Sequence, residues 1–183
     1  MKNKEISISL IPLQEEDREQ FIIDNQWAFK YGAQIEFGMR DERTEEGEEV
    51  ISRHTIEQCL DGENAKAYRI VLSGKHVGGL VLKIDAIEKK GELELLFVSP
   101  EAHSKGIGRA AWKAVEGLHP EIHVWETITP YFEKRNIHFY VNCCGFQIVE
   151  FWNKYHHGPA VPEEEQGNWS EDDEMFVFRK TIV

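Results

Sequence analysis

Between Leu93 and Val115 the chain reads LELLFVSPEAHSKGIGRAAWKAV, and this segment constrains the local fold more than any other. A strand-forming apolar run is followed by a turn with Pro100, a short basic loop and a helix-forming stretch. Gly106 and Gly108 lack a Cβ, so the loop backbone can come close to a ligand and its amides can converge on phosphate oxygens. The positive end of the helix that follows points the same way. The segment therefore predicts a cradle for phosphate groups.

Length and charge limit the classes of protein to which this chain can belong. Its 183 residues are enough to bury one core, so we expect a single domain over residues 1–183. The formal net charge of −12 argues against a nucleic-acid-binding surface, because such a surface needs clustered Lys and Arg. An acidic surface suits cationic small molecules, or serves only for solubility.

The cysteines and histidines give little support for a metal site. Cys59, Cys143 and Cys144 are few and odd in number, and they lack the CxxC or Cys/His spacing of metal ligands. The adjacent His156 and His157 stand beside Gly and Pro in an expected loop. We therefore expect no bound metal, reduced thiols and a cytoplasmic protein. The chain shows neither a secretory signal nor an apolar stretch of membrane-spanning length, so we expect no membrane association.

Apolar spacing and turn residues predict the order of helices and strands. Ser73-Gly74-Lys75-His76 has the composition of a hairpin turn, and Lys89-Lys90-Gly91 forms a second turn. Three successive strands therefore make an antiparallel meander that leads into the glycine loop. The expected strands are 6–12, 67–72, 77–84, 92–98, 123–129, 146–152 and 175–181, and the expected helices are 15–31, 48–60, 108–117 and 131–142.

Two charged segments fall between these elements. Residues 40–49, which read RDERTEEGEE, are typical of a solvated loop or helix end. Residues 156–174 are rich in Pro, Gly and acids, and they are long for a connection inside a compact domain. We expect them to form a functional flap or a mobile excursion.

The order of elements and the glycine loop together resemble the GNAT superfamily of acyl-CoA-dependent N-acyltransferases, along nearly the whole chain. The family's loop, Gln/Arg-x-x-Gly-x-Gly/Ala, corresponds to His103-Ser104-Lys105-Gly106-Ile107-Gly108, after Val98-Ser99-Pro100 in the family's Val-x-Pro position. Gly145-Phe146 opens a late strand after a helix with a tyrosine. The loop lacks the patterns of ATP and NAD sites, so it favours the diphosphate of CoA. The implied fold is α/β, of the α+β type, with a central, mixed and mostly antiparallel sheet flanked by helices.

The resemblance implies acetyl-CoA as the co-substrate and assigns residues to it. Phe97 and Val98 would pair with the pantetheine amides like an added strand. Asn136 corresponds to the family's CoA-contacting asparagine. The diphosphate would be held by His103, Ser104, Lys105, Gly106, Ile107, Gly108 and Arg109.

Two positions depart from the family pattern. His103 stands where Gln or Arg is usual, and it can donate a hydrogen bond but is no permanent cation, so Lys105 and Arg109 carry more of the binding. Tyr140 lies five residues before Gly145 instead of four, so a one-residue insertion is needed to bring it into the family's place.

Acyl transfer from a thioester to an amine needs a base, a donor to the oxyanion and an acid for the thiolate. The resemblance implies Glu92 as the first candidate base. Glu126, in the strand expected beside it, is the second, and Glu94 shares the face of Glu92 by the period of two. Tyr140 would protonate the thiolate, and a backbone N–H near Val98, where the family's fourth strand is bulged, would meet the oxyanion. The alternatives are that the glutamates face solvent and that Tyr140 anchors the core.

We therefore expect an N-acetyltransferase that moves the acetyl group from acetyl-CoA directly to a primary amine of a small molecule or peptide. A route through Cys143 or Cys144 is less attractive, because nothing in the local sequence lowers a thiol pKa. The alternative function is a non-catalytic acyl-CoA-binding sensor module. We expect residues 156–174, which include Trp169, to flank the mouth of the acceptor site. The sequence does not identify the acceptor, and it leaves a homodimer open.

Overall fold

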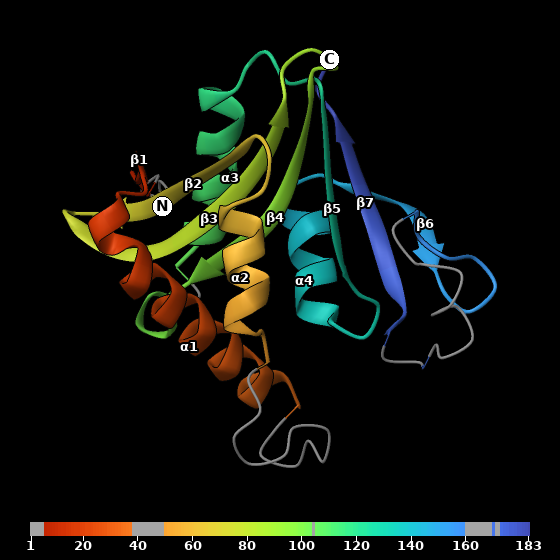
Figure 1. The fold of residues 1–183 in the computed structure, drawn as a ribbon, viewed down its shortest axis with the longest axis horizontal. Helices are drawn as coiled ribbons and strands as arrows, with labels where there is room; N and C mark the ends of the chain where they lie inside the picture. The colour runs from red at the N-terminus through yellow and green to blue at the C-terminus, as the bar shows by residue number, and fades with distance from the viewer. Residues whose placement is uncertain (1–5, 38–49, 104, 160–169, 171–172) are drawn as a thin grey trace, which may run out of the picture.

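The computed structural model describes residues 6–37, 50–103, 105–159, 170 and 173–183. Within this part of the chain, one seven-stranded sheet has the order β1-β2-β3-β4-β5-β7-β6 (Figure 1). Every neighbouring pair is antiparallel except β4 and β5, which are parallel. The strands are β1 (Ser9–Pro12), β2 (Ala65–Leu72), β3 (Lys75–Asp85), β4 (Lys90–Val98), β5 (Val124–Pro130), β6 (Gln147–Trp152) and β7 (Met175–Thr181). The mixed, mostly antiparallel sheet that the sequence predicts is confirmed.

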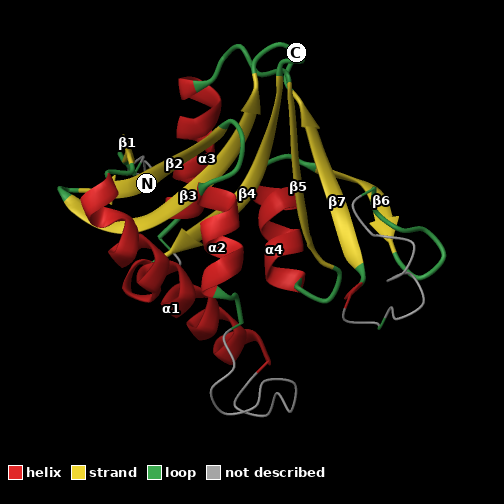
Figure 2. Ribbon diagram, in the orientation of Figure 1, coloured by secondary structure: helices red, strands yellow, loops and turns green. Residues whose placement is uncertain are grey.

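Helices cover both faces of the sheet, with α1 and α2 in front and α3 behind in Figure 2. Each face has its own apolar core. Phe21 of α1 and Ile56 of α2 pack with Val81, Leu95 and Phe97 on the front face, whereas the rear core is built around Trp112 of α3, Trp125 and Phe146. The helical elements are η1 (Glu15–Asp17), α1 (Arg18–Phe37), α2 (Arg53–Leu60), η3 (Pro100–Ala102), α3 (Ile107–Leu118), α4 (Lys134–His138) and the π-helical turn η4 (Phe139–Cys143).

A buried ion pair fixes α1 against the sheet. The side chain of Arg69 on β2 is only 2% exposed, and its Nε and Nη1 donate to Asp17 at 2.6 Å and to Asp24 at 2.8 Å. The guanidinium also lies 5.2 Å from the centre of the Phe21 ring. Pairing with two carboxylates offsets the cost of burying the charge. The arrangement holds α1 across the front of β3 and β4.

Most of the elements predicted from the sequence are confirmed, with shifted ends. The hairpin between β2 and β3 turns at Ser73 and Gly74, which both have positive φ (51° and 79°), as a type I′ turn requires. The helix expected over 131–142 is instead a short α-helix followed by the π turn. Residues 40–49 and most of 156–174 lie outside the described residues. No helix in the described part of the chain is long and apolar enough to cross a membrane.

Candidate active site

The parallel strands β4 and β5 separate soon after they meet. Within the described residues, their pairing joins only Lys90–Glu92 to Val124–Glu126. The next β4 residues pair with β3 alone, and Val81 and Leu82 of β3 face Leu95 and Leu93, so Glu94 is an extra residue in β4. This is a β-bulge, which bends a strand and breaks the alternation of its side chains. The edge of β4 after Glu94 therefore turns away from β5.

The expected bulge near Val98 is wrong. Pairing of β3 with β4 is regular from Leu95 to Val98, and the irregularity lies four residues earlier, at Glu94. The physical reason lies in the packing: Leu93 contributes to the rear core, whereas Leu95 contributes to the front core, although both are odd-numbered residues of one strand. One extra residue between them is needed to point the two side chains to opposite faces of the sheet, each into its own core.

A chain of hydroxyl groups lies at the point where the two strands part. Oγ1 of the buried Thr127 on β5 donates to the carbonyl oxygen of Leu93 at 2.8 Å. The hydroxyl of Tyr140 forms a hydrogen bond with Thr127, and because Thr127 already donates to Leu93, it accepts from Tyr140. Burial raises the pKa of Tyr140 to about 12. Tyr140 is therefore a protonated donor at neutral pH.

The π turn η4 places Tyr140 there. In this turn the amide of Cys144 donates to the carbonyl of Phe139, five residues earlier, at 3.0 Å. A π turn accommodates one more residue than an α-helical turn. It therefore absorbs the extra residue between Tyr140 and Gly145 and leaves the Tyr140 ring in the rear core, against Phe146 and Phe178.

The glycine loop ends in the first turn of α3. Gly106 is in the left-handed region, with φ of 73°, and among the described side chains none caps the start of this helix. Its first amides therefore point out of the helix end without an intrahelical acceptor. Gly108 has a different reason to be glycine, since a Cβ there would come within 3.1 Å of the Phe139 ring. Lys105 and Arg109 are exposed, and Ser104 lies outside the described residues.

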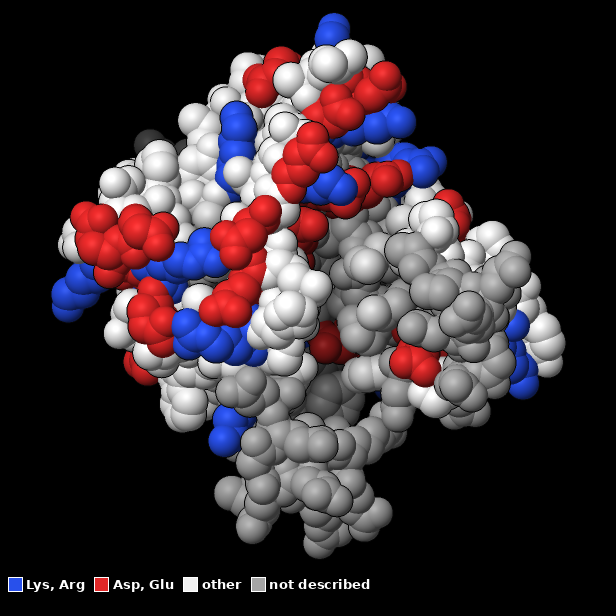
Figure 3. All heavy atoms as spheres, viewed as in Figure 1, with Lys and Arg blue, Asp and Glu red and all other residues white. Residues whose placement is uncertain are grey.

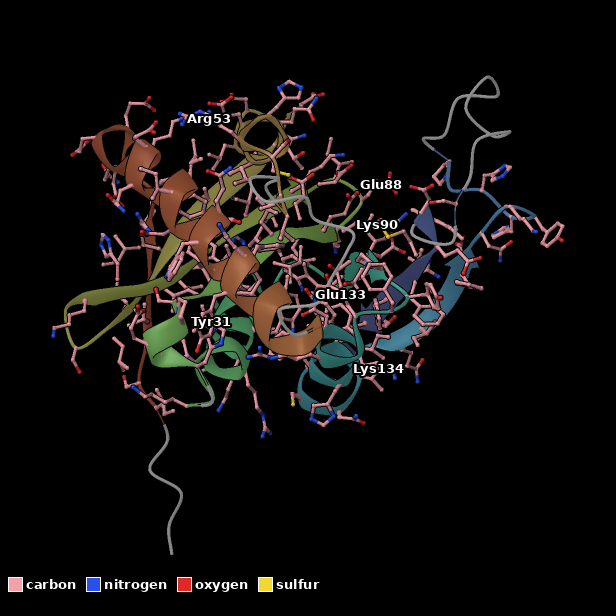
Figure 4. All side chains as sticks on the ribbon, turned by 90° about the horizontal axis from the view of Figure 1, so that it is seen from below. Tyr31, Arg53, Glu88, Lys90, Glu133 and Lys134 are labelled. Carbon is pink, nitrogen blue, oxygen red and sulfur yellow. The ribbon has the colours of Figure 1, made fainter. Side chains whose placement is uncertain are left out.

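His103 lies between the loop and the end of β4. Its Nε2 is 2.8 Å from the carbonyl oxygen of Val98, and its ring packs edge-on against Tyr31 of α1, with 5.6 Å between ring centres. Phe97 is buried against Phe21 on the front face. Asn136 of α4 donates from Nδ2 to Oγ1 of Thr129 at 3.3 Å and also contacts Glu133. Figure 4 shows this end of the molecule from below, with Tyr31 and Glu133 labelled.

The glutamates predicted as bases form part of a charged row on the front face. Glu92 pairs with Glu126 across the two strands, as expected. The Glu92 carboxylate is 4.0 Å from Nζ of Lys83, and its side chain is 53% exposed. Glu126 is paired with Arg179 of β7 at 2.6 Å. Figure 3 shows acidic and basic side chains interleaved over this part of the sheet.

Glu94 differs from both of these glutamates. Its Oε2 is buried and has no hydrogen-bond partner among the described residues. Burial raises the pKa of Glu94, the charge of Glu92 raises it further, and Lys83 opposes the shift. The same carboxylate helps to raise the pKa of Cys59 on α2, so Glu94 faces the front layer of helices. Alternation alone places Glu94 equivalent to Glu92, and the sequence carries no direct signal for the bulge that turns it inward.

Metal ligands are not clustered in this part of the chain. Within residues 6–37, 50–103, 105–159, 170 and 173–183, no three His, Cys, Asp or Glu side chains are grouped as a metal site requires.

Known proteins share this fold along almost the whole chain. An acetyltransferase from Thermus thermophilus superposes with a TM-score of 0.66 at 14% identity, covering 97% of this chain and 98% of that one. The PaiA N-acetyltransferase from Thermoplasma acidophilum, solved in complex with coenzyme A, gives 0.64 at 19% identity, covering 97% and 100%. At these identities the likeness shows the fold alone.

Sequence comparison identifies the family. Residues 24–146 match the Acetyltransferase (GNAT) family. The chain is also 44% identical over 136 residues to the uncharacterized protein YrkN of Bacillus subtilis (strain 168), covering 73% of this chain and 74% of that one. The chain therefore belongs to the GNAT family and is an acetyltransferase, as the sequence predicts.

Proposed function

We propose that this acetyltransferase uses acetyl-CoA and transfers the acetyl group directly to a primary amine of a small molecule or peptide. The observation that carries the proposal is the separation of β4 from β5 after Glu92, with the hydroxyl of Tyr140 held there by Thr127. An extended chain with amide groups can pair with a free strand edge. A thioester at the end of such a chain would then lie between the two strands, beside a proton donor.

The co-substrate would be held in two places. The pantetheine arm would lie along the β4 edge at Phe97 and Val98 and pass Asn136. The diphosphate would lie at the start of α3, where a glycine in the left-handed region and the exposed helix amides favour an anion. The sequence assigns the diphosphate to His103, Ser104, Lys105, Gly106, Ile107, Gly108 and Arg109, and of these His103 would act indirectly, because its Nε2 is already bonded to the carbonyl oxygen of Val98. Gly108 would act through its backbone amide, because the space above its Cα is filled by Phe139.

Glu94 is the base that we favour. A base must accept a proton near neutral pH, and a carboxyl with a raised pKa accepts it more readily than an ordinary one. The unpartnered Oε2 of Glu94 is available for this, whereas Glu126 is neutralised by Arg179 and Glu92 is largely in solvent. Glu92 stays exposed on the front face, where its negative charge attracts an ammonium group.

The remaining steps use Tyr140 and the backbone. The amine attacks the thioester carbonyl, and a backbone N–H on the free edge of β4 stabilises the oxyanion. When the C–S bond breaks, Tyr140 protonates the thiolate. Direct transfer is supported by the cysteines, since burial raises the pKa of Cys59 to about 11 and that of Cys144 to about 12. Thiols of this kind are poor nucleophiles at neutral pH.

Release of free thiol from acetyl-CoA tests the proposal. We would screen polyamines, amino acids, aminoglycosides and peptides with a free N-terminus, and confirm the acetylated product by mass spectrometry. Amine-dependent thiol release is expected with at least one class. CoA binding without thiol release from any amine would favour the sensor instead. We propose a cytoplasmic setting, which agrees with the free thiols of Cys59, Cys143 and Cys144.

A further inference from the structure

His103 connects the glycine loop to helix α4. Its Nε2 lies 2.8 Å from the carbonyl oxygen of Val98, which can only accept a hydrogen bond, so Nε2 carries the hydrogen. Nδ1 is then an acceptor, and Nη2 of Arg135 lies 3.1 Å from it. Both ring nitrogens are therefore engaged, and the ring also packs edge-on against Tyr31.

This arrangement changes what the first position of the loop can do. A neutral imidazole that already donates to Val98 has no second N–H for a phosphate oxygen, and it has no charge. The guanidinium of Arg135 carries a permanent positive charge, and it is held at the same position by the ring. The positive charge beside the first position of the loop therefore comes from a residue of α4 and not from the loop itself.

We propose that Arg135, positioned by His103, binds the diphosphate of CoA and supplies the positive charge that the first position of the loop lacks. This inference rests on the proposed function, in which the diphosphate lies at the start of α3. Lys105 and Arg109 would act from the loop and the first turn of α3, and Arg135 from α4. The diphosphate is then gripped from two sides.

The anchoring of α4 supports this role. Asn136, the next residue, donates to Thr129 at 3.3 Å, which fixes the start of α4 to the end of β5. An arginine whose backbone is anchored through α4 and whose guanidinium is held by His103 loses less conformational freedom when it binds a phosphate. Nearby carboxylates on the same two segments are Glu101 and Glu133, and Lys105 bonds to the carbonyl oxygen of Glu101 at 3.1 Å. A cation from α4 offsets this negative charge around the loop.

The chain offers a matched control for the test. Lys134 is the preceding residue, it is exposed like Arg135, and its replacement by Gln removes the same charge. Arg135→Gln and Lys134→Gln would be titrated by calorimetry with CoA and with dephospho-CoA, which keeps the diphosphate but lacks the 3′-phosphate. Arg135→Gln is expected to raise the Kd of both ligands about tenfold, because a charge-assisted hydrogen bond is lost. Lys134→Gln is expected to change each Kd less than about twofold.

Two results would overturn the assignment. One is an equal effect of the two variants, which would mean that only net charge matters. The other is a loss seen with CoA and absent with dephospho-CoA, which would place Arg135 at the 3′-phosphate. If the wild-type protein binds neither ligand, the proposed function itself has failed, which is a different outcome.

The role of His103 is tested by rescue. His103→Arg restores the family's cation at the loop, so adding it to Arg135→Gln should bring the Kd for CoA back to within about threefold of the wild-type value. A positioning role also predicts that His103→Ala and Arg135→Gln are not additive. Additive losses together with an absence of rescue would show that His103 does not act through Arg135.

Discussion

Replacing Glu94 by Gln separates a catalytic role from a structural one. The substitution keeps the size of the side chain and removes its ability to accept a proton. General-base catalysis contributes about 10²–10⁴ in rate, so kcat/KM should fall by about that factor, or about 3–5 kcal/mol. The pH profile should change as well. In the wild-type protein kcat/KM rises with pH as Glu94 loses its proton, and in the variant the remaining pH dependence follows the acceptor amine alone.

The same substitution is expected to stabilise the fold. Burial raises the pKa of Glu94 above its ordinary value of 4.5, so the folded protein holds this proton more tightly than the unfolded chain does. The stability that this group contributes is therefore present at low pH and is lost as pH rises through its pKa in the folded protein. A neutral Gln removes that loss. Glu94→Gln should match the stability of the wild type near pH 4 and exceed it at neutral pH.

The assays are thiol release over a range of pH and denaturant unfolding at acid and neutral pH. Glu92→Gln is the matched control, because Glu92 is exposed and lies two residues before Glu94 in the same strand. It should keep most of the activity and shift the rising limb to lower pH, since removing its charge lowers the pKa of Glu94. Full activity of Glu94→Gln, or loss of both activity and stability, would refute the reasoning. Near-complete inactivation by Glu92→Gln alone would return the base to Glu92.

The rear face of the site leads to three more predictions. Tyr140→Phe should lower kcat about 10²-fold with little change in KM for acetyl-CoA, because it removes a proton donor and leaves the ring in place; an unchanged kcat in steady-state assays would make Tyr140 a core residue only. Gly108→Ala would place a Cβ 3.1 Å from the Phe139 ring, so in chemical unfolding Gly108→Ala should be tolerated better in a Phe139→Leu background than in the wild type, and equal effects in the two backgrounds would contradict the contact. Cys143→Ala and Cys144→Ala should each keep kcat within about threefold, and no acetylated enzyme should be trapped by mass spectrometry; burst release of thiol without an amine would contradict direct transfer.

The sequence predicts the meander, the glycine loop and the order of elements, because these depend on local chemistry. Gly74 and Gly106 both have the positive φ that their positions suggest, and the strands on either side follow apolar alternation. The pairing of Glu92 with Glu126 also follows once β4 and β5 are placed side by side. These features need no knowledge of how the two cores are packed.

The features that local patterns do not predict all depend on tertiary packing. The bulge at Glu94 is invisible in the stretch ELELLF, which alternates well enough to suggest an unbroken strand, and only the two cores on opposite faces require it. The π turn likewise appears in the sequence only as one residue too many before Gly145. The contact of Arg135 with His103 joins residues 32 positions apart. No spacing rule connects them.

The contact between Gly108 and Phe139 links the two ends of the proposed co-substrate site. Gly108 belongs to the turn proposed to grip the diphosphate, and Phe139 is the neighbour of the residue proposed to protonate sulfur. Because the helix and the ring are in contact at this point, the separation between anchor and proton donor is set by the protein. The enzyme would then be productive only with a thioester arm whose length matches this separation.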